Sequence, residues 1–385
     1  MPPSILIVAG EASADQHGAK VLARLRADRP DVTSFGVGGE ALCAEGLTPV
    51  ARAEDISVAG LTEVLFAIPR ILGIMRRLER TAMERRPQVA VLIDLPDFNL
   101  RLAKRLKRLG IPVVYYISPQ VWAWRPKRVE QIRRIVDKML VILPFEEAFY
   151  RQHGIDAEFV GHPLVEDLPQ TTNALAARVS LGLGEAEGPI VALLPGSREK
   201  EVARHLPTML LALRLLRDSI PKLRAVLPIA STIARDAVLA LIREHGADVT
   251  VVNGRATEAL IASDAAVVCS GTATLQTALL ERPMVVVYRV SWLTYQIVRR
   301  LVRVGFISLV NLIAGRELVR ELIQRDMTAA NIASAVRPLL VDRRAHDALQ
   351  GELHALREKL GGPGAAVRVA QVVAGYLPAP GANTP

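Results

Sequence analysis

Polar residues that could carry chemistry follow apolar runs at four places in the sequence. These places are Gly10–Asp15, Asp94–Asn99, Leu194–Glu199 and Ser270–Gln276. At the second place, Asp97 is a carboxylate near the carboxyl end of an expected strand, where it can accept a proton from a hydroxyl nucleophile. Asp97 could equally be the N-cap of the helix that follows. The Asp-x-x-Asp spacing of Asp94 and Asp97 gives little support to a metal-bridged diphosphate, and no histidine spacing predicts a metal site.

Two of the four places predict an anion site. Gly196, Ser197 and Arg198 form a tight turn before a helix, where backbone N–H groups favour an anion and the Arg198 guanidinium adds a permanent charge. The stretch Ser270-Gly271-Thr272-Ala273-Thr274 repeats the order of strand, small polar turn and helix. Together the two turns predict a diphosphate held between two helix N-termini. The chain has no GxxxxGK[ST] motif, which excludes a P-loop nucleotide hydrolase.

The remaining place, Gly10–Asp15, allows two interpretations. Ser13 or Asp15 could cap the helix that begins there. That interpretation leaves Glu11 unexplained, and its small neighbours would let a ligand approach the backbone.

A nearby stretch, Gly36–Ala41, matches the dinucleotide pattern G-x-G-x-x-A, but it follows the second strand rather than the first and Gly46 interrupts the next helix. This isolated match therefore gives little support to nicotinamide binding.

The elements that must position these residues alternate between short apolar strands and amphipathic helices. Strands are expected at 4–10, 33–39, 90–98, 112–119, 139–145 and 157–163, with helices near 17–28 and 99–110. After a more polar stretch the alternation resumes, with strands expected at 189–194, 224–230, 248–254, 265–271 and 284–290. Such alternation predicts an α/β fold with doubly wound parallel sheets. We expect ligands to bind where the carboxyl ends of the strands meet.

The same pattern predicts the domain boundaries. We expect a first domain over 1–165, a linker over 166–188, a second domain over 189–335, C-terminal helices over 336–376 and a disordered tail over 377–385.

The composition narrows the classes of partner that the protein could bind. The formal net charge of the 385 residues is +9 and half of them are hydrophobic, which excludes a disordered chain. It also argues against nucleic acid, because basic nucleic-acid binders are usually polar as well. Residues 101–138 hold eleven Lys or Arg and two acidic residues, an excess that equals the charge of the whole chain.

An apolar segment at 56–75 precedes this basic stretch. It includes Phe66, Ile68 and Leu72, and Arg76 and Arg77 follow it. Basic residues beside an exposed apolar helix are typical of a protein that docks on an anionic membrane surface. The alternative is a core helix with a solvated basic end. We expect no membrane span, no signal peptide, and reduced cysteines typical of a cytosolic protein.

The motifs together resemble the lipid-A-disaccharide synthase family of bacterial glycosyltransferases. The resemblance covers roughly residues 4–330, and its matching stretches include GEASAD (10–15), IDLPDFN (93–99), YYISPQVWAWRPKRV (115–129), LPFE (143–146), LLPGSREKEV (193–202), SGTATLQ (270–276) and LVNLIAGRELVRELIQ (309–324). It implies a GT-B fold, in which two Rossmann-like domains face a cleft and C-terminal helices pack back on the first domain.

The resemblance also implies the reaction and the roles of residues. The family joins UDP-2,3-diacylglucosamine to 2,3-diacylglucosamine 1-phosphate with inversion, giving a β-1,6-linked disaccharide and UDP, with no cofactor or metal. Asp97 would be the general base, and Glu11, Ser13 and Asp15 would line the acceptor side. The donor would contact Gly196, Ser197, Arg198, Ser270, Gly271, Thr272, Thr274, Gln276 and Asn311. The enzyme would be cytoplasmic and peripheral on the inner face of the bacterial inner membrane, and an oligomer is possible.

Some positions depart from the family's pattern. Gln276 stands where the family usually has Glu, Ala14 replaces a Gly, Gln120 a Ser, and Val310 the Pro before Asn311. Two other functions stay open: another GT-B enzyme acting on a UDP-sugar, such as an epimerase or a transferase with a different lipid acceptor, and a nonenzymatic lipid-binding protein at the membrane surface.

Overall fold

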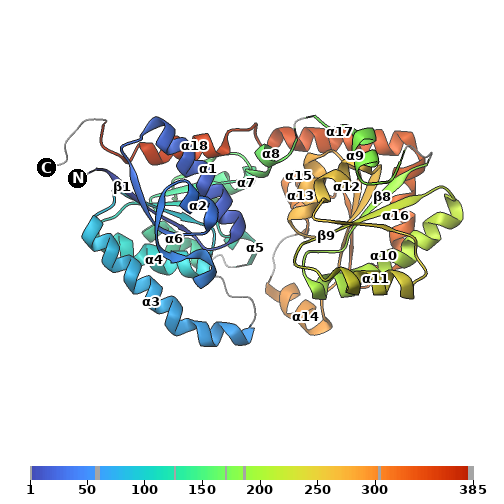
Figure 1. Ribbon diagram of the computed structural model, residues 1–385, viewed down its shortest axis with the longest axis horizontal. Coiled ribbons are helices and arrows are strands. Elements are labelled where there is room, and N and C mark those ends of the chain that lie inside the picture. The colour runs from blue at the N-terminus through green and yellow to red at the C-terminus, as the bar shows by residue number, and fades with distance from the viewer. Residues whose placement is uncertain are drawn as a thin grey trace. The chain divides into compact units, whose positions relative to one another are not determined.

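The computed structural model describes residues 2–56, 61–124, 127–169, 171–184, 188–301 and 305–379, and of 61–67, 124, 127, 293, 297, 298, 300 and 301 it describes only the backbone (Figure 1). The chain divides into two compact units. Unit 1 consists of Met1–Glu166 and Leu360–Pro385, and unit 2 consists of Asp167–Lys359. The chain therefore crosses from unit 1 to unit 2 and returns near its C-terminus.

Unit 1 contains a parallel sheet in the order β3-β2-β1-β4-β5-β6-β7. Its strands are β1 (Ser4–Ala9), β2 (Thr33–Gly38), β3 (Leu47–Arg52), β4 (Val89–Ile93), β5 (Val113–Tyr116), β6 (Lys138–Val141) and β7 (Ala157–Phe159). The strand order reverses between β1 and β4, which pair directly through Leu6 and Ala90. A reversal of this kind leaves a crevice at the carboxyl ends of the two strands, and ligands of open α/β sheets bind there.

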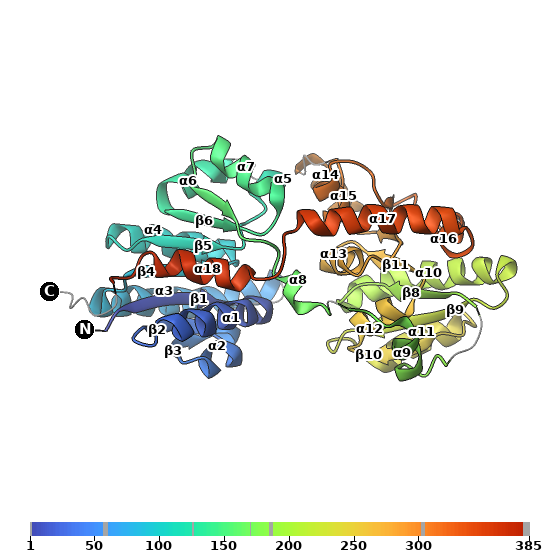
Figure 2. The ribbon, with the colours of Figure 1, turned by 90° about the horizontal axis from the view of Figure 1, so that it is seen from above.

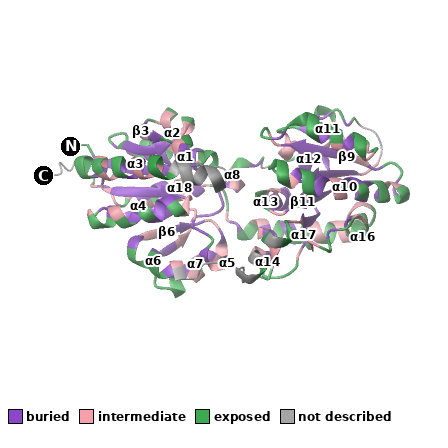
Figure 3. Ribbon diagram, turned by 90° about the horizontal axis from the view of Figure 1, so that it is seen from below, coloured by how far each residue is buried: buried purple, intermediate pink, exposed green. Residues whose placement is uncertain are grey.

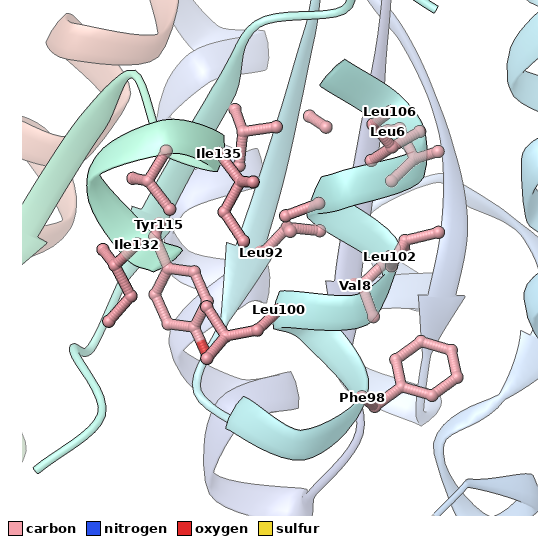
Figure 4. Close-up of a cluster of buried hydrophobic side chains, with 14 of the residues drawn as sticks. Leu6, Val8, Leu92, Phe98, Leu100, Leu102, Leu106, Tyr115, Ile132 and Ile135 are labelled. Carbon is pink, nitrogen blue, oxygen red and sulfur yellow. The ribbon is translucent and has the colours of Figure 1, made fainter. Parts of the chain in front are cut away.

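Helices cover both faces of this sheet. They are α1 (Ala12–Asp28), α2 (Glu40–Ala44), α3 (Leu61–Arg85), α4 (Pro96–Arg108), α5 (Val121–Trp124), α6 (Lys127–Ile135), α7 (Pro144–Gln152), α8 (Leu164–Asp167) and α18 (Ala365–Ala374). One face packs against α3, α4 and α6, where Leu92, Leu102 and Tyr115 belong to a buried apolar cluster (Figure 4). The other face packs against α1 and α18. The strands are buried and the outer helix surfaces exposed (Figure 3).

Unit 2 repeats the design with a parallel sheet in the order β10-β9-β8-β11-β12-β13. Its strands are β8 (Ile190–Leu194), β9 (Arg224–Ile229), β10 (Thr250–Asn253), β11 (Ala265–Cys269), β12 (Met284–Tyr288) and β13 (Arg320–Ile323). Its helices are α9 (Ala174–Ser180), α10 (Glu199–Ser219), α11 (Arg235–Glu244), α12 (Ala256–Ala262), α13 (Thr272–Leu279), α14 (Trp292–Leu301), α15 (Leu309–Ala314), α16 (Ala329–Val341) and α17 (Arg343–Lys359). The strand order here reverses between β8 and β11.

The unit boundaries differ from the expected ones. Most of the stretch expected as a linker belongs to unit 2, because α9 packs against α12. The helices expected to pack together on the first domain are divided: α16 packs on α10 and α17 on α13, both in unit 2, whereas only α18 lies along α1 in unit 1 (Figure 2). Leu377, expected in the disordered tail, is buried, and residues 380–385 lie outside the described residues.

Residues 61–75 of the apolar segment expected to dock on a membrane form the first part of α3, and residues 57–60 lie outside the described residues. Among its side chains, Ile68 is 43% exposed and Leu72 is half-buried, whereas Ile74, Leu78 and Ala82 further along the helix belong to the core. Arg76 and Arg77 are exposed. The Phe66 side chain lies outside the described residues. Within the described part of the chain, no helix is both long enough and apolar enough to cross a bilayer.

Candidate active site

The loops after β1 and β4 place the predicted residues of unit 1 at the point where the strand order reverses. Asp97 is the second residue of α4, and its carboxylate is 73% exposed. The N-cap of α4 is Leu95, without a side-chain cap bond, so Asp97 is not the N-cap that we considered. The Arg128 guanidinium, from α6, donates to the Asp97 carboxylate at 2.7 Å and holds it in position. Asp97 thus presents an oriented carboxylate to solvent.

The backbone beneath Asp97 adopts an unusual conformation. Asp94 and Leu95 both have left-handed φ angles, of 49° and 45°. Non-glycine residues in this region cost of order 1–3 kcal/mol each and often mark functional sites. The strained turn is held by its Asp94 carbonyl, which accepts from the Tyr115 hydroxyl at 2.6 Å and from the Asn99 amide at 2.7 Å.

A second carboxylate lies at the same edge. Burial, followed by repulsion from the Glu11 carboxylate, raises the pKa of Asp94 above its usual value. Glu11 and Ser13 are exposed, and Glu11 lines a pocket of about 680 Å³ together with Asp15, Glu40 and Glu54. No cation stands among the described residues that line this pocket. The pocket suits hydroxyl groups rather than the phosphate of an acceptor.

Asp15, predicted to bind an acceptor, lines this pocket and also has a structural role. Its carboxylate is 5% exposed and accepts from the backbone N–H groups of Gly39, Ala41 and Leu42 at 2.6, 3.0 and 3.3 Å. It therefore caps α2, not the helix α1 on which it lies. The same contacts explain the stretch that matched a dinucleotide pattern, because its glycine turn wraps around the Asp15 carboxylate.

Sequence reasoning missed Glu146, the most deeply buried carboxylate at this edge. Its side chain, 1% exposed, accepts from the Ser118 hydroxyl at 2.7 Å, the Trp122 indole N–H at 3.0 Å and the Leu143 backbone N–H at 3.1 Å. Burial raises the pKa of Glu146 to about 7. The only signal in the sequence was that its LPFE stretch and the VWAW stretch both match the family, without any indication that they touch.

Unit 2 has a pocket of about 450 Å³ at its own reversal point, between β8 and β11. Gly196, Ser197 and Arg198 line it from the turn after β8, and Ser270, Gly271, Thr272 and Gln276 line it from the turn after β11 and from α13. The two predicted turns are therefore neighbours in space, each leading into a helix N-terminus. An anion between them would meet backbone N–H groups, both helix dipoles and the Arg198 guanidinium.

The turn at Gly196 has no room for a side chain. Its φ of +126° lies in the region that favours glycine, and a Cβ there would stand 2.6 Å from Glu201. Glu201 accepts from the backbone N–H groups of Ser197 and Arg198, at 3.1 and 3.3 Å, and pairs with the Arg198 guanidinium at 3.3 Å. Sequence reasoning missed this contact. The Arg198 side chain remains 82% exposed.

Two residues predicted to contact a donor do not line this pocket. Thr274 is fully buried, and its hydroxyl donates to the Gly271 carbonyl at 2.7 Å. Asn311 is also buried, and its amide donates to Val319 and Glu321 and accepts from two backbone N–H groups. Both side chains stabilise the turns behind the pocket. Their side-chain hydrogen bonds are made within the protein.

A family model described as "Lipid-A-disaccharide synthetase" matches residues 5–370. The chain is 53% identical over 374 residues to the lipid-A-disaccharide synthase of Anaeromyxobacter dehalogenans, covering 97% of each, and 50% identical over 377 residues to that of Myxococcus xanthus, covering 98% of each.

Solved structures share the fold at low identity. A UDP-N-acetylglucosamine 2-epimerase from Listeria monocytogenes, described as putative, superposes with a TM-score of 0.67 at 12% identity, covering 98% of this chain and 97% of that one. The calicheamicin glycosyltransferase CalG4 superposes with a TM-score of 0.59 at 14% identity, covering 97% and 98%. These likenesses support the expected GT-B class and, at such identities, concern the fold alone.

Proposed function

The chain belongs to the lipid-A-disaccharide synthase family, and we propose how its own residues carry out the transfer that makes the lipid A disaccharide. The enzyme is a glycosyltransferase that takes a UDP-sugar donor, UDP-2,3-diacylglucosamine, and a lipid acceptor, 2,3-diacylglucosamine 1-phosphate. The observation that carries our proposal is the exposed Asp97 carboxylate, oriented by Arg128 at the strand reversal of unit 1.

Asp97 acts as the general base. It accepts the proton of the acceptor's 6-hydroxyl while that oxygen forms a bond to the anomeric carbon of the donor. The bond from this carbon to UDP breaks on the opposite side, and its electron pair leaves with the β-phosphate oxygen. Inversion follows from this single displacement, which needs no covalent intermediate on the enzyme. Glu11 and Ser13 contribute hydrogen bonds to hydroxyl groups of the acceptor.

The pocket of unit 2 holds the donor. Gly196, Ser197 and Gly271 present backbone close to the diphosphate, and Arg198 stabilises the charge that develops on the leaving UDP. Ser270, Thr272 and Gln276 line the same pocket. Arg198 is suited to this role because its side chain is 82% exposed and lines the pocket.

Two variants test the catalytic base and the donor site separately. We expect D97N to lower disaccharide formation by roughly 10²–10⁴-fold with unchanged UDP affinity, and R198A to weaken UDP binding as well. Matched controls are D156N, which changes another exposed aspartate that pairs with a cation in unit 1, and R204A on the exposed face of α10. Full activity of D97N would refute the base.

The same assay decides against the alternatives. Release of UDP without disaccharide, or only with another acceptor, would indicate a different GT-B enzyme. Activity that survives both D97N and R198A would favour a nonenzymatic lipid-binding role.

We also propose that α3 docks the enzyme on the cytoplasmic face of the inner membrane. The exposed Ile68, the half-buried Leu72 and the cations Arg76 and Arg77 support this proposal, because an apolar stripe beside basic residues binds anionic lipid surfaces. Phe66 belongs to the same segment.

A further inference from the structure

His205 is a fully buried histidine of α10 that has no part in the transfer described above. Both of its ring nitrogens have partners in the backbone just beyond a strand. Nδ1 lies 2.8 Å from the carbonyl oxygen of Pro195, which follows β8, and Nε2 lies 3.0 Å from the backbone nitrogen of Arg289, which follows β12. The imidazole therefore connects the ends of two strands.

The two strands that His205 connects are not neighbours. In the sheet of unit 2, β11 lies between β8 and β12, so their ends are about 10 Å apart, two strand spacings. Backbone groups at that distance cannot bond each other directly. All three strand ends border the donor pocket, which Leu194, Cys269 and Tyr288 line from β8, β11 and β12. The His205 ring also lies beside the Tyr288 ring, with the two centroids 5.8 Å apart.

The partners of His205 determine where its ring carries a proton. A carbonyl oxygen only accepts, so Nδ1 carries the hydrogen that bonds Pro195. The Arg289 N–H only donates, so Nε2 accepts from it as the unprotonated nitrogen of a neutral ring. The Arg289 carbonyl oxygen, 3.1 Å from Nε2, would bond only a doubly protonated ring. Burial lowers the pKa of His205 below its usual value, which agrees with the neutral form.

The bond to Pro195 orients the peptide group that begins the diphosphate turn. Pro195 and Gly196 are joined by a trans peptide bond, in which the N–H points away from the C=O. Because the Pro195 carbonyl faces His205, the Gly196 N–H faces the opposite way, away from the buried ring. Gly196 lines the donor pocket. His205 therefore determines the direction in which the first N–H of this turn points.

Resting on the proposed donor site, we propose that His205 is a positioning residue for the donor's diphosphate. Its imidazole holds the Pro195 carbonyl so that the Gly196 N–H is oriented toward a phosphate oxygen before the donor binds. The bond to Arg289 holds the ring against the end of β12. His205 itself does not touch the donor.

Two variants separate the two bonds of the ring. The amide of H205N lies near the place of Nδ1 and can still donate to the Pro195 carbonyl. The longer side chain of H205Q places its amide near Nε2 and leaves that carbonyl without its donor. In titration calorimetry with the purified full chain, we expect H205Q to bind UDP about 5–10-fold more weakly than the original, within the net worth of one hydrogen bond. H205N should bind UDP nearly as tightly as the original.

Two further measurements distinguish a displaced turn from a damaged protein. Uridine carries no phosphate, so its affinity, measured by competition with UDP, should be the same in the original chain, H205N and H205Q. In the transfer reaction, H205Q should raise the KM for the UDP-sugar donor and leave the KM for the acceptor unchanged. H245Q makes the same change at a histidine that follows α11 and does not line the pocket, and it should bind UDP like the original. Thermal unfolding confirms that each variant is folded.

UDP binding by H205Q that equals that of the original chain would overturn the proposal, and so would equal losses in H205N and H205Q. A parallel loss of uridine and UDP affinity would show that His205 supports the pocket as a whole and not the diphosphate turn. Each of these results would leave the donor site itself intact. If the original chain bound no UDP, the donor site would fail, and the role of His205 with it.

Discussion

The Glu201 carboxylate accepts hydrogen bonds from the backbone N–H groups of Ser197 and Arg198, which we assign to the edge of the diphosphate site. It also pairs with Arg198, the cation that we expect to meet the leaving UDP. An arriving diphosphate therefore competes with an internal anion for one guanidinium. Coulomb repulsion between the two anions opposes donor binding.

We predict that E201Q binds UDP more tightly, by about 3–10-fold or about 1 kcal/mol. The glutamine oxygen can still accept from Ser197, so the turn keeps its shape while the negative charge is lost. E199Q makes the same change of charge at an exposed residue of the first turn of α10 and should alter affinity less. UDP binding by calorimetry at low salt is the measurement, and weaker binding by E201Q than by E199Q would contradict the prediction.

Glu146 should make the stability of unit 1 depend on pH. Its pKa is raised from an ordinary value of 4.5 to about 7, so the folded state binds a proton more readily than the unfolded state. The stability that Glu146 contributes is then fully present below about pH 4.5 and is lost as the pH rises through about 7. The shift corresponds to about 3 kcal/mol at 1.36 kcal/mol per unit.

The measurement compares denaturant unfolding of the original chain and of E146Q at pH 5 and pH 8. Trp fluorescence in a W292F background reports on unit 1, because the two remaining tryptophans are at 122 and 124. Relative to E146Q, the original should be less stable at pH 8 than at pH 5. E147Q, on the more exposed adjacent residue, should follow the original. Parallel curves for the original and E146Q would refute the assignment.

The sequence predicted where the site lies better than it predicted the role of each residue in the site. The turns at Gly196–Arg198 and Ser270–Thr272 could be predicted because small residues before a helix have a local cause. The structural roles of Asp15 and Asn311 could not be predicted, because the sequence does not reveal where a polar side chain makes its hydrogen bonds. Glu146 was missed because its partners Ser118 and Trp122 are distant in sequence.

Among the secondary-structure elements, the central strands were predictable because each is an apolar, β-branched run between turn residues. Of the four edge strands, β7 and β10 were predicted but β3 and β13 were not, since LTPVAR and RELI carry polar residues and β3 contains Pro49. In α3 the later half belongs to the core, whereas the earlier half exposes Ile68, on which the docking proposal rests.

We predict that I68S with L72S lowers sedimentation of the protein with anionic vesicles, because both changes remove apolar area from the docking segment. R76Q with R77Q should weaken binding by about 1 kcal/mol per charge at low salt. M83S changes another exposed apolar residue of the same helix, 51% exposed, and should leave binding intact. Equal loss in M83S, or no loss in I68S with L72S, would refute this docking face.

At the scale of the whole molecule, amphipathic helices near the C-terminus could be predicted, but not the unit that each helix covers. A helical apolar stripe shows that one face is buried, and it says nothing of the partner. The structure assigns α16 and α17 to unit 2 and α18 to unit 1. In unit 1 the Arg368 guanidinium donates to the Val160 carbonyl at 2.7 Å, and Val369 and Val373 are buried.

We predict that V369A and V373A each destabilise unit 1 by roughly 2 kcal/mol, because each opens a cavity beside α1. Unit 2 should be unaffected. The W292F background reports on unit 1, and a W122F/W124F background leaves Trp292 to report on unit 2. UDP binding should persist in both variants. Equal destabilisation of the two units would contradict the division.

The late return of α18 has a consequence for how the enzyme is made. Helix α1 leaves the ribosome early, but α18, which covers its apolar surface, is synthesised only after the whole of Asp167–Lys359. At about 5–20 residues per second, those roughly 200 residues take about 10–40 s. During that interval the apolar surface of α1 that α18 later covers stays exposed on the nascent chain, while unit 2, which is contiguous in sequence, can fold as it emerges. Translation thus completes the donor half before the acceptor half, the reverse of their order in the gene.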